Sequence, residues 1–134
     1  MDEIPASLRQ FIFDYIDSVE QLEVLLFLRM HQNQWFTVDA ISAEFRSSPQ
    51  SIESRLKALQ NSKLVQIENS TPAKPKYCYS AIAEFDAIIE ELGVTYRLRR
   101  QTVLEFIFSP LKRGRQFAEA FIIKKTKTDG DSNG

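Results

Sequence analysis

The sequence predicts a mainly helical α+β fold that contains one small antiparallel pair of strands. Three observations support this prediction. Several segments carry apolar residues at the spacing of three to four that is typical of amphipathic helices. Two short segments rich in branched and aromatic residues flank a loop with two prolines. After the second of them, apolar residues continue at a heptad-like spacing from residue 82 to residue 106.

The first two helices are indicated by their apolar spacing and by a capping residue between them. Pro5 can occupy the first turn of a short helix that places Leu8, Phe11, Ile12, Tyr15 and Ile16 on one side. Ser18 is the expected N-cap of the next helix, and Gln21 follows at the capping-box position. The sequence therefore predicts a helix over Val19–His31.

Two further helices are expected, each with its own N-cap. Thr37 opens a helix over residues 38–45, and Ser48 opens another over Pro49–Asn61, with Pro49 at the position where its missing N–H costs nothing. The buried stripe of the second of these helices consists of Ile52, Leu56 and Leu59. Residues 64–68 and 77–80 then alternate as strands on either side of the loop.

The C-terminal part, residues 81–109, is expected to form one long helix. Arg99 occupies a position where the seam requires an apolar residue, and Pro110 ends the segment. The seam can pack back across the domain and bury the N-terminal helix, or it can pair with a second copy. We favour pairing, through Phe85, Ile89, Leu92, Tyr96, Val103 and Phe106. In an antiparallel pair, the acidic residues 84–91 would face the basic residues 97–100.

The composition excludes several classes of protein. The chain has 134 residues, one Cys and one His, so neither a disulfide framework nor a zinc site is expected. The longest uncharged apolar run, Val24–Leu28, is far too short to span a membrane. Asp2 and Glu3 stand where a secretory signal would be basic, so we expect a cytoplasmic protein. We also expect no metal or other cofactor.

The formal net charge of −1 hides blocks of opposite sign. Residues 1–45 carry −6, residues 46–80 carry +4, residues 81–96 carry −4 and residues 97–128 carry +7, with a further −2 in residues 129–134. Charge acts locally because salt screens it beyond about 10 Å. The near-neutral total is therefore no argument against a nucleic-acid partner.

Residues 19–79 resemble the winged helix-turn-helix domain of small bacterial transcriptional regulators. The resemblance rests on residues 37–45, on the turn over residues 46–52, and on residues 56–65, where the second helix runs into the wing. It implies residues 1–80 as one domain, residues 81–109 as a dimerisation or docking element, and residues 110–134 as a short basic segment with a disordered tail. Residues 96–100, 103–110 and 117–121 resemble the C-terminal region of small uncharacterised bacterial proteins of this kind, which implies no active site.

A polar stripe on the helix Pro49–Asn61 is the candidate DNA-reading surface. Gln50 can read adenine bidentately, whereas Lys57 and Arg46 are placed for phosphates and the wing lysines for the adjacent backbone. Glu53 beside this stripe would repel phosphate, and a polar stripe is also what any solvated helix presents. The expected contact residues are Arg46, Ser48, Gln50, Ser51, Ser54, Lys57, Asn61, Lys74 and Lys76.

No enzyme is predicted. Glycine occurs only at positions 93, 114, 130 and 134, so there is no phosphate-binding loop, and no catalytic triad can be nominated. His31 is expected at a helix end and Cys78 as a buried thiol. The function we expect is that of a homodimeric DNA-binding transcriptional regulator. The alternative is an adaptor that binds a protein partner through its C-terminal helix and does not bind DNA.

Overall fold

The computed structural model describes residues 4–69 and 74–109. Pro110, the basic segment and tail predicted after it, and the centre of the wing loop lie outside these residues. The described elements are the helices α1 (Ala6–Tyr15), α2 (Val19–Met30), α3 (Val38–Phe45), α4 (Pro49–Asn61), α5 (Ala83–Leu98) and α6 (Arg100–Ile107), and the strands β1 (Phe36–Thr37), β2 (Val65–Glu68) and β3 (Lys76–Tyr79).

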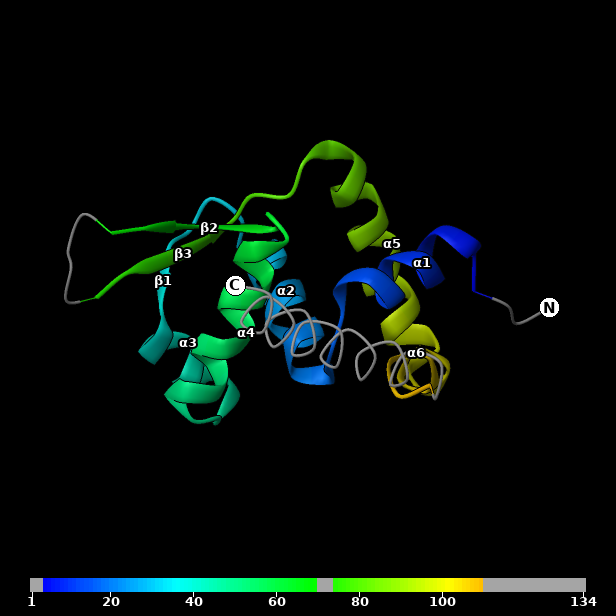
Figure 1. Ribbon diagram of the computed structural model, residues 1–134, viewed down its shortest axis with the longest axis horizontal. Helices are drawn as coiled ribbons and strands as arrows, with labels where there is room; N and C mark the ends of the chain where they lie inside the picture. Colours follow the sequence, from blue (N-terminus) through cyan, green and yellow to red (C-terminus); the bar gives the residue numbers. More distant parts are fainter. Residues whose placement is uncertain (1–3, 70–73, 110–134) are drawn as a thin grey trace, which may run out of the picture.

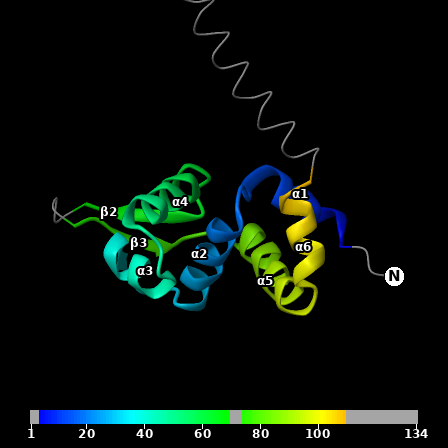
Figure 2. The same ribbon diagram turned by 90° about the horizontal axis from the view of Figure 1, so that it is seen from below.

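The elements form two groups joined by α2. One end of the molecule holds the sheet with α3 and α4, and the other holds α1, α5 and α6 (Figures 1 and 2). The sheet is antiparallel with strand order β1-β3-β2, and Tyr77 on the central strand is paired with Phe36 and Ile67 on its two neighbours. Strand β1 adds a third strand to the two-strand wing that the sequence predicts. We refer to β1–β3 with α3 and α4 as the head.

The three predicted N-caps are confirmed, and they explain where these helices begin. In each case, the side-chain oxygen of the cap accepts a hydrogen bond from a backbone N–H that the helix leaves unpaired. These bonds run from Gln21 N to Ser18 Oγ (3.0 Å), from Ala40 N to Thr37 Oγ1 (3.1 Å) and from Ser51 N to Ser48 Oγ (3.1 Å). Local sequence therefore determines the starts of α2, α3 and α4.

A single hydrophobic core extends from one end of the molecule to the other. The predicted α4 stripe of Ile52, Leu56 and Leu59 is fully buried, and so are Leu22, Leu25 and Leu28 of α2. Leu8 and Ile12 of α1 belong to the same cluster. None of the described helices is both long enough and apolar enough to cross a membrane.

The prediction of one long helix over residues 81–109 is wrong. The helix stops at Arg99, whose φ of −138° and ψ of 53° end α5 and begin α6. Both helices contact α1, so the chain folds back over its own N-terminal helix. The break occurs at Arg99, the residue that interrupts the apolar seam, and Nη2 of its side chain is buried without a hydrogen-bond partner among the described residues.

The heptad-like seam packs into the hydrophobic core of the chain itself. Ile89, Leu92 and Val103 are fully buried, Tyr96 is nearly so, and the partly buried Phe85 and Phe106 pack against the same core. Of the two alternatives that the sequence left open for this seam, the structure shows the one in which it covers the N-terminal helix. A homodimer therefore needs a different surface.

Candidate nucleic-acid interface

One face of α4 is free of contacts with the rest of the described chain. Gln50, Ser54, Lys57 and Asn61 follow one another at intervals of four, three and four residues, and all four are exposed. The buried stripe of α4 lies on the opposite side of the helix. The head therefore presents a continuous polar stripe of the length of the helix, as the sequence predicts.

The turn between α3 and α4 holds α4 at a fixed angle to α3. Arg46 ends α3 in the left-handed conformation, with φ of 53° and ψ of 40°. The amide of Ser47 donates to the carbonyl of Ser42 (3.1 Å), and the Ser42 hydroxyl donates back to the carbonyl of Ser47. Arg46 itself is exposed beside the first turn of α4. This tight turn places a cation where α4 would meet a phosphate.

A carboxylate on α2 also binds the α3–α4 turn and α4, and the sequence did not predict this contact. Glu20 accepts hydrogen bonds from the hydroxyls of Ser47 and Ser51 and from Nε of Arg55, the last at 3.0 Å. The three donors recur every four residues, so they line one side of the turn and α4. We call this group the Glu20 clamp. In the sequence, the spacing of four residues between the donors indicates that they share one side of the turn and α4. Nothing near them in the sequence indicates that their acceptor is Glu20.

The clamp changes the interpretation of two predicted contact residues. The hydroxyl of Ser51 is directed to Glu20 on α2, so Ser51 supports α4 from within the head. Ser48 remains exposed, but its oxygen caps α4. Burial by itself would raise the pKa of Glu20, but the hydrogen bonds from Ser47, Ser51 and Arg55 and the charge of Arg55 outweigh it and lower the pKa. The carboxylate is therefore held ionised.

The wing brings more positive charge to the same side of the head. Lys76 on β3 is exposed and paired with Thr37 of β1 and Glu68 of β2, and Lys74 just precedes β3. Lys74 lines a hollow between the wing, α3 and α4 together with Glu53. Glu53 therefore faces the wing rather than the exposed stripe of α4, which weakens the objection that its charge raised.

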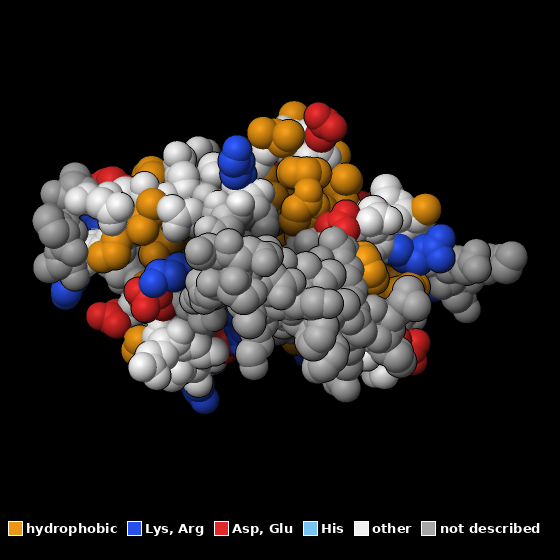
Figure 3. Space-filling model, in the orientation of Figure 1, with side chains coloured by type: hydrophobic (Ala, Val, Ile, Leu, Met, Phe, Trp, Pro, Cys, Tyr) orange, Lys and Arg blue, Asp and Glu red, His pale blue; other side chains and the backbone are white. Residues whose placement is uncertain are grey.

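Basic side chains outnumber acidic ones on the described surface of the head. Between residues 36 and 79, the exposed acidic side chains are Asp39, Glu44 and Glu68. The exposed basic ones are Arg46, Lys57, Lys63, Lys74 and Lys76. Figure 3 shows both signs interspersed at the end of the molecule that carries the sheet. The excess is modest, so selectivity for DNA would depend on the placement of the basic groups.

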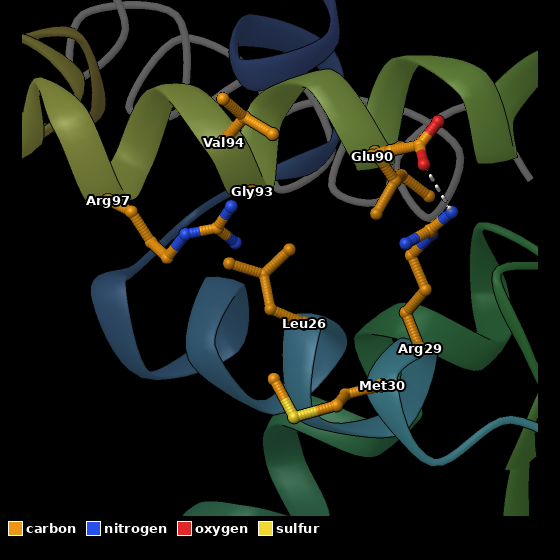
Figure 4. A pocket seen from close by; sticks show the side chains of 8 residues that line it. Leu26, Arg29, Met30, Glu90, Gly93, Val94 and Arg97 are labelled. Atoms are coloured by element: carbon orange, nitrogen blue, oxygen red, sulfur yellow. Dashed lines mark ion pairs between the residues drawn. The ribbon is translucent and has the colours of Figure 1, made fainter.

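The other sides of α2 bind the C-terminal helices. Arg29 pairs with Asp86 at 2.9 Å, Tyr79 of β3 donates to the same carboxylate at 2.6 Å, and Tyr96 donates to Glu23 at 2.7 Å. Arg29 also reaches Glu90 at 3.7 Å (Figure 4). Burial and the bond to Glu23 raise the pKa of Tyr96 to about 12. Helix α2 therefore connects α4 to α5 through polar contacts on its different sides.

These contacts make the stability of the chain dependent on pH in the acid range. The hydrogen bond from Arg29, and next the one from Tyr79, lower the pKa of Asp86, and the pKa of Glu20 is also lowered. A carboxyl group whose pKa falls on folding stabilises the native state above its unfolded pKa, and this stabilisation is lost as the pH falls through the folded pKa. We therefore expect the free energy of unfolding to fall as the pH is lowered below about 5.

Denaturant titrations of the parent and of Asp86→Asn at several pH values test this expectation. The variant is expected to be less stable at neutral pH and to lose less stability on acidification, since one of the responsible groups is gone. A variant whose pH profile runs parallel to that of the parent would contradict the assignment to Asp86.

Neither residue with enzymatic potential forms a reactive centre. Nδ1 of His31 lies 2.9 Å from the carbonyl of Phe27, and its ring packs against Phe27 and Phe36. Cys78 is buried, with its thiol 3.6 Å from the carbonyl of Tyr79. Within residues 4–69 and 74–109, no group of His, Cys, Asp and Glu side chains is arranged to hold a metal.

The fold is that of a winged helix-turn-helix protein, and solved structures with a similar fold include a transcription regulator. MepR, a transcription regulator of the Staphylococcus aureus multidrug efflux pump MepA, matches with a TM-score of 0.54 and 15% sequence identity, over 90% of this chain and 87% of MepR. A MepR variant bound to an oligodeoxyribonucleotide gives 0.52 and 14%, over 90% and 89% of the two chains. A variant of Lactococcus lactis ZitR gives 0.53 and 15%, over 96% and 81%.

Comparisons with protein-family models and with curated protein sequences give no match. At these identities, the structural likeness establishes the fold alone, and function has to be argued from the site.

Proposed function

We propose that this protein binds duplex DNA as a homodimeric transcriptional regulator, with α4 in the major groove. The observation that carries the proposal is the exposed stripe of Gln50, Ser54, Lys57 and Asn61 on a helix that the Glu20 clamp holds in place. Reading bases requires a protruding element whose orientation is fixed, and α4 meets both conditions. The role is one of binding rather than catalysis, in the cytoplasm.

Each contact has a distinct expected role. Gln50, in the first turn of α4, is placed to read an adenine, and Ser54 and Asn61 extend the same stripe along the groove. Arg46 and Lys57 would neutralise phosphates on either side, and Lys74 and Lys76 would bring the wing to the neighbouring backbone. Ser48 and Ser51 serve the interface indirectly, since one caps α4 and the other is bound to Glu20.

The structural neighbours support the proposal through the roles of those proteins. They are described as transcription regulators, and one MepR variant was crystallised on an oligodeoxyribonucleotide. No contact within the described residues favours the adaptor alternative.

Fluorescence anisotropy with labelled random duplex DNA tests the proposal. We expect binding at about 50 mM salt that weakens by at least tenfold at about 200 mM, because phosphate contacts release counterions. The affinity for random duplex should be modest, since the acidic N-terminal half opposes the basic segments. The absence of any binding at the lower salt concentration would overturn the proposal.

A further inference from the structure

The outward side of α5 is an unpartnered helix face with a regular pattern. Its residues lie within about 60° of Val94 on the helical wheel, and every one of them is exposed. We call this face the outer stripe of α5, formed by Ala83, Ala87, Glu90, Glu91, Val94, Arg97 and Leu98. Small and apolar side chains run along its centre, with Val94 40% exposed and Leu98 76% exposed.

The surface continues onto α2 through a shallow groove. Leu26 and Met30 of α2 line it together with Gly93 and Val94 of α5, and Met30 is 76% exposed. A Cβ at position 93 would lie 3.4 Å from Cδ2 of Leu26, so Gly93 packs directly beside Leu26 where the two helices meet. Figure 4 shows Arg97 at one end of this groove and the Arg29–Glu90 pair at the other.

The charges on the outer stripe complement each other under a two-fold rotation. On the helical wheel, Glu90 and Arg97 lie on the same side of Val94. Along the helix axis, Glu90 precedes Val94 and Arg97 follows it. When two such stripes pack antiparallel about Val94, Glu90 of each chain faces Arg97 of the other, as g positions do in antiparallel coiled coils. In the described chain, the Glu90 side chain remains 67% exposed, and Arg97 makes no ion pair with any described residue.

The apolar positions are compatible with the same pairing. Leu98, Glu91 and Ala87 lie together on the opposite side of Val94, so Leu98 of one copy would pack between the small Ala87 and the methylenes of Glu91 of the other. The methylenes of Arg97 from the second copy would cover the groove between α2 and α5. A parallel pair would instead bring Glu90 of each chain against Glu91 of the other and would leave Arg97 beside Leu98, and this repulsion selects the antiparallel arrangement.

We infer that the outer stripe of α5 is the surface through which two copies of this chain associate. The inference rests on the homodimer in the proposed function and specifies its contact surface. It replaces the seam of Phe85, Ile89, Leu92, Tyr96, Val103 and Phe106, which the structure places in the core of the chain.

Analytical ultracentrifugation over a concentration series tests the apolar part of the stripe. The parent is expected near 31 kDa, which is twice 15.5 kDa, and Val94→Asp near 15.5 kDa. Trp35→Asp is the matched control, because Trp35 is also 40% exposed but belongs to the connection between α2 and β1, and it should remain dimeric. Circular dichroism checks that both variants are folded.

Charge reversal tests the antiparallel register itself. Glu90→Arg and Arg97→Glu are each expected to raise the dimer dissociation constant at least tenfold, and the double variant should restore it to within about threefold of the parent. If the double variant shows the sum of the two single losses of dimer affinity, instead of a restored affinity, the pairing is overturned. An unchanged dissociation constant in both Val94→Asp and Leu98→Asp would overturn it as well.

The outcomes separate this inference from the proposed function. DNA affinity is measured independently by anisotropy, so a dimer that dissociates as expected but never binds DNA would overturn only the function. A chain that binds DNA but is monomeric, or dimerises through another surface, would overturn only the inference.

Discussion

Replacing Lys57 with glutamate is expected to weaken binding to duplex DNA by at least tenfold at low salt. Lys57 is exposed in the middle of the polar stripe of α4, so the change removes one phosphate contact and introduces a repulsion at the same place. The slope of log Kd against log salt concentration should also fall by about one, because fewer counterions are released on binding. Anisotropy titrations at several salt concentrations measure both quantities.

Arg9→Glu provides the matched control for this experiment. It changes the net charge by the same amount, but Arg9 is exposed on α1, in the group of helices opposite the head. Its effect on DNA affinity should be several-fold smaller. Equal effects of the two variants would mean that only the total charge matters and that α4 does not contact DNA.

Lys74→Glu should act in the same direction as Lys57→Glu. Lys74 lies at the base of the wing beside the hollow that Glu53 also lines, so we expect a smaller loss than at Lys57. Among the candidate contacts, Gln50→Ala is expected to change sequence preference more than total affinity, because the contact proposed for Gln50 is with a base rather than a phosphate.

Removing the carboxylate of Glu20 is expected to destabilise the chain by about 2 kcal/mol. Glu20→Ala leaves the hydroxyls of Ser47 and Ser51 and the guanidinium of Arg55 without their acceptor, and all three belong to the α3–α4 turn or to α4. The Glu20 side chain is only 22% exposed, so water replaces these bonds incompletely. Urea denaturation at neutral pH measures the loss.

The same variant should weaken DNA binding beyond the effect of its lower stability. With the clamp removed, α4 keeps its apolar contacts and the α3–α4 turn but loses its hydrogen bonds to Glu20, and a more mobile α4 would lose more entropy on binding DNA. Affinity is therefore compared at a temperature where the variant remains fully folded. Glu44→Ala, at an exposed position on α3, is the matched control and should leave both quantities within the range of ordinary surface substitutions.

A double-mutant cycle between Glu20 and Arg55 shows whether the clamp acts as a unit. Nε of Arg55 and Oε1 of Glu20 are separated by 3.0 Å, so the double variant should lose less stability than the sum of the two single losses. Additive losses at Glu20 and Arg55, or a Glu20→Ala variant as stable as the Glu44→Ala control, would show that the clamp does not hold α4.

The sequence by itself determined the local architecture of the head. Ser18, Thr37 and Ser48 cap helices where their side chains can reach an N–H only three residues away. The stripe of Ile52, Leu56 and Leu59 likewise fixes which face of α4 is buried, and so which face is exposed. Such features depend on contacts within a single turn of helix, so they can be derived without knowledge of the fold.

Only the tertiary structure decided where the C-terminal seam packs. The apolar residues 85–106 need a partner surface, but their pattern is the same whether that surface belongs to α1 or to a second chain. The break at Arg99 turns α6 back onto α1, and the apolar seam is buried within the chain. The outer stripe of α5 could be separated from the seam only once the buried side of α5 was known.

The Glu20 clamp was beyond sequence reasoning for a similar reason. Glu20 and Arg55 are 35 residues apart, and their contact exists because the apolar faces of α2 and α4 dock in one particular register. In the sequence, Glu20 belongs to a block of charge −6 that would oppose DNA binding at long range, whereas in the structure it holds α4 in place. Local periodicity defines which residues face inward, but the packing of one helix against another determines which polar groups meet.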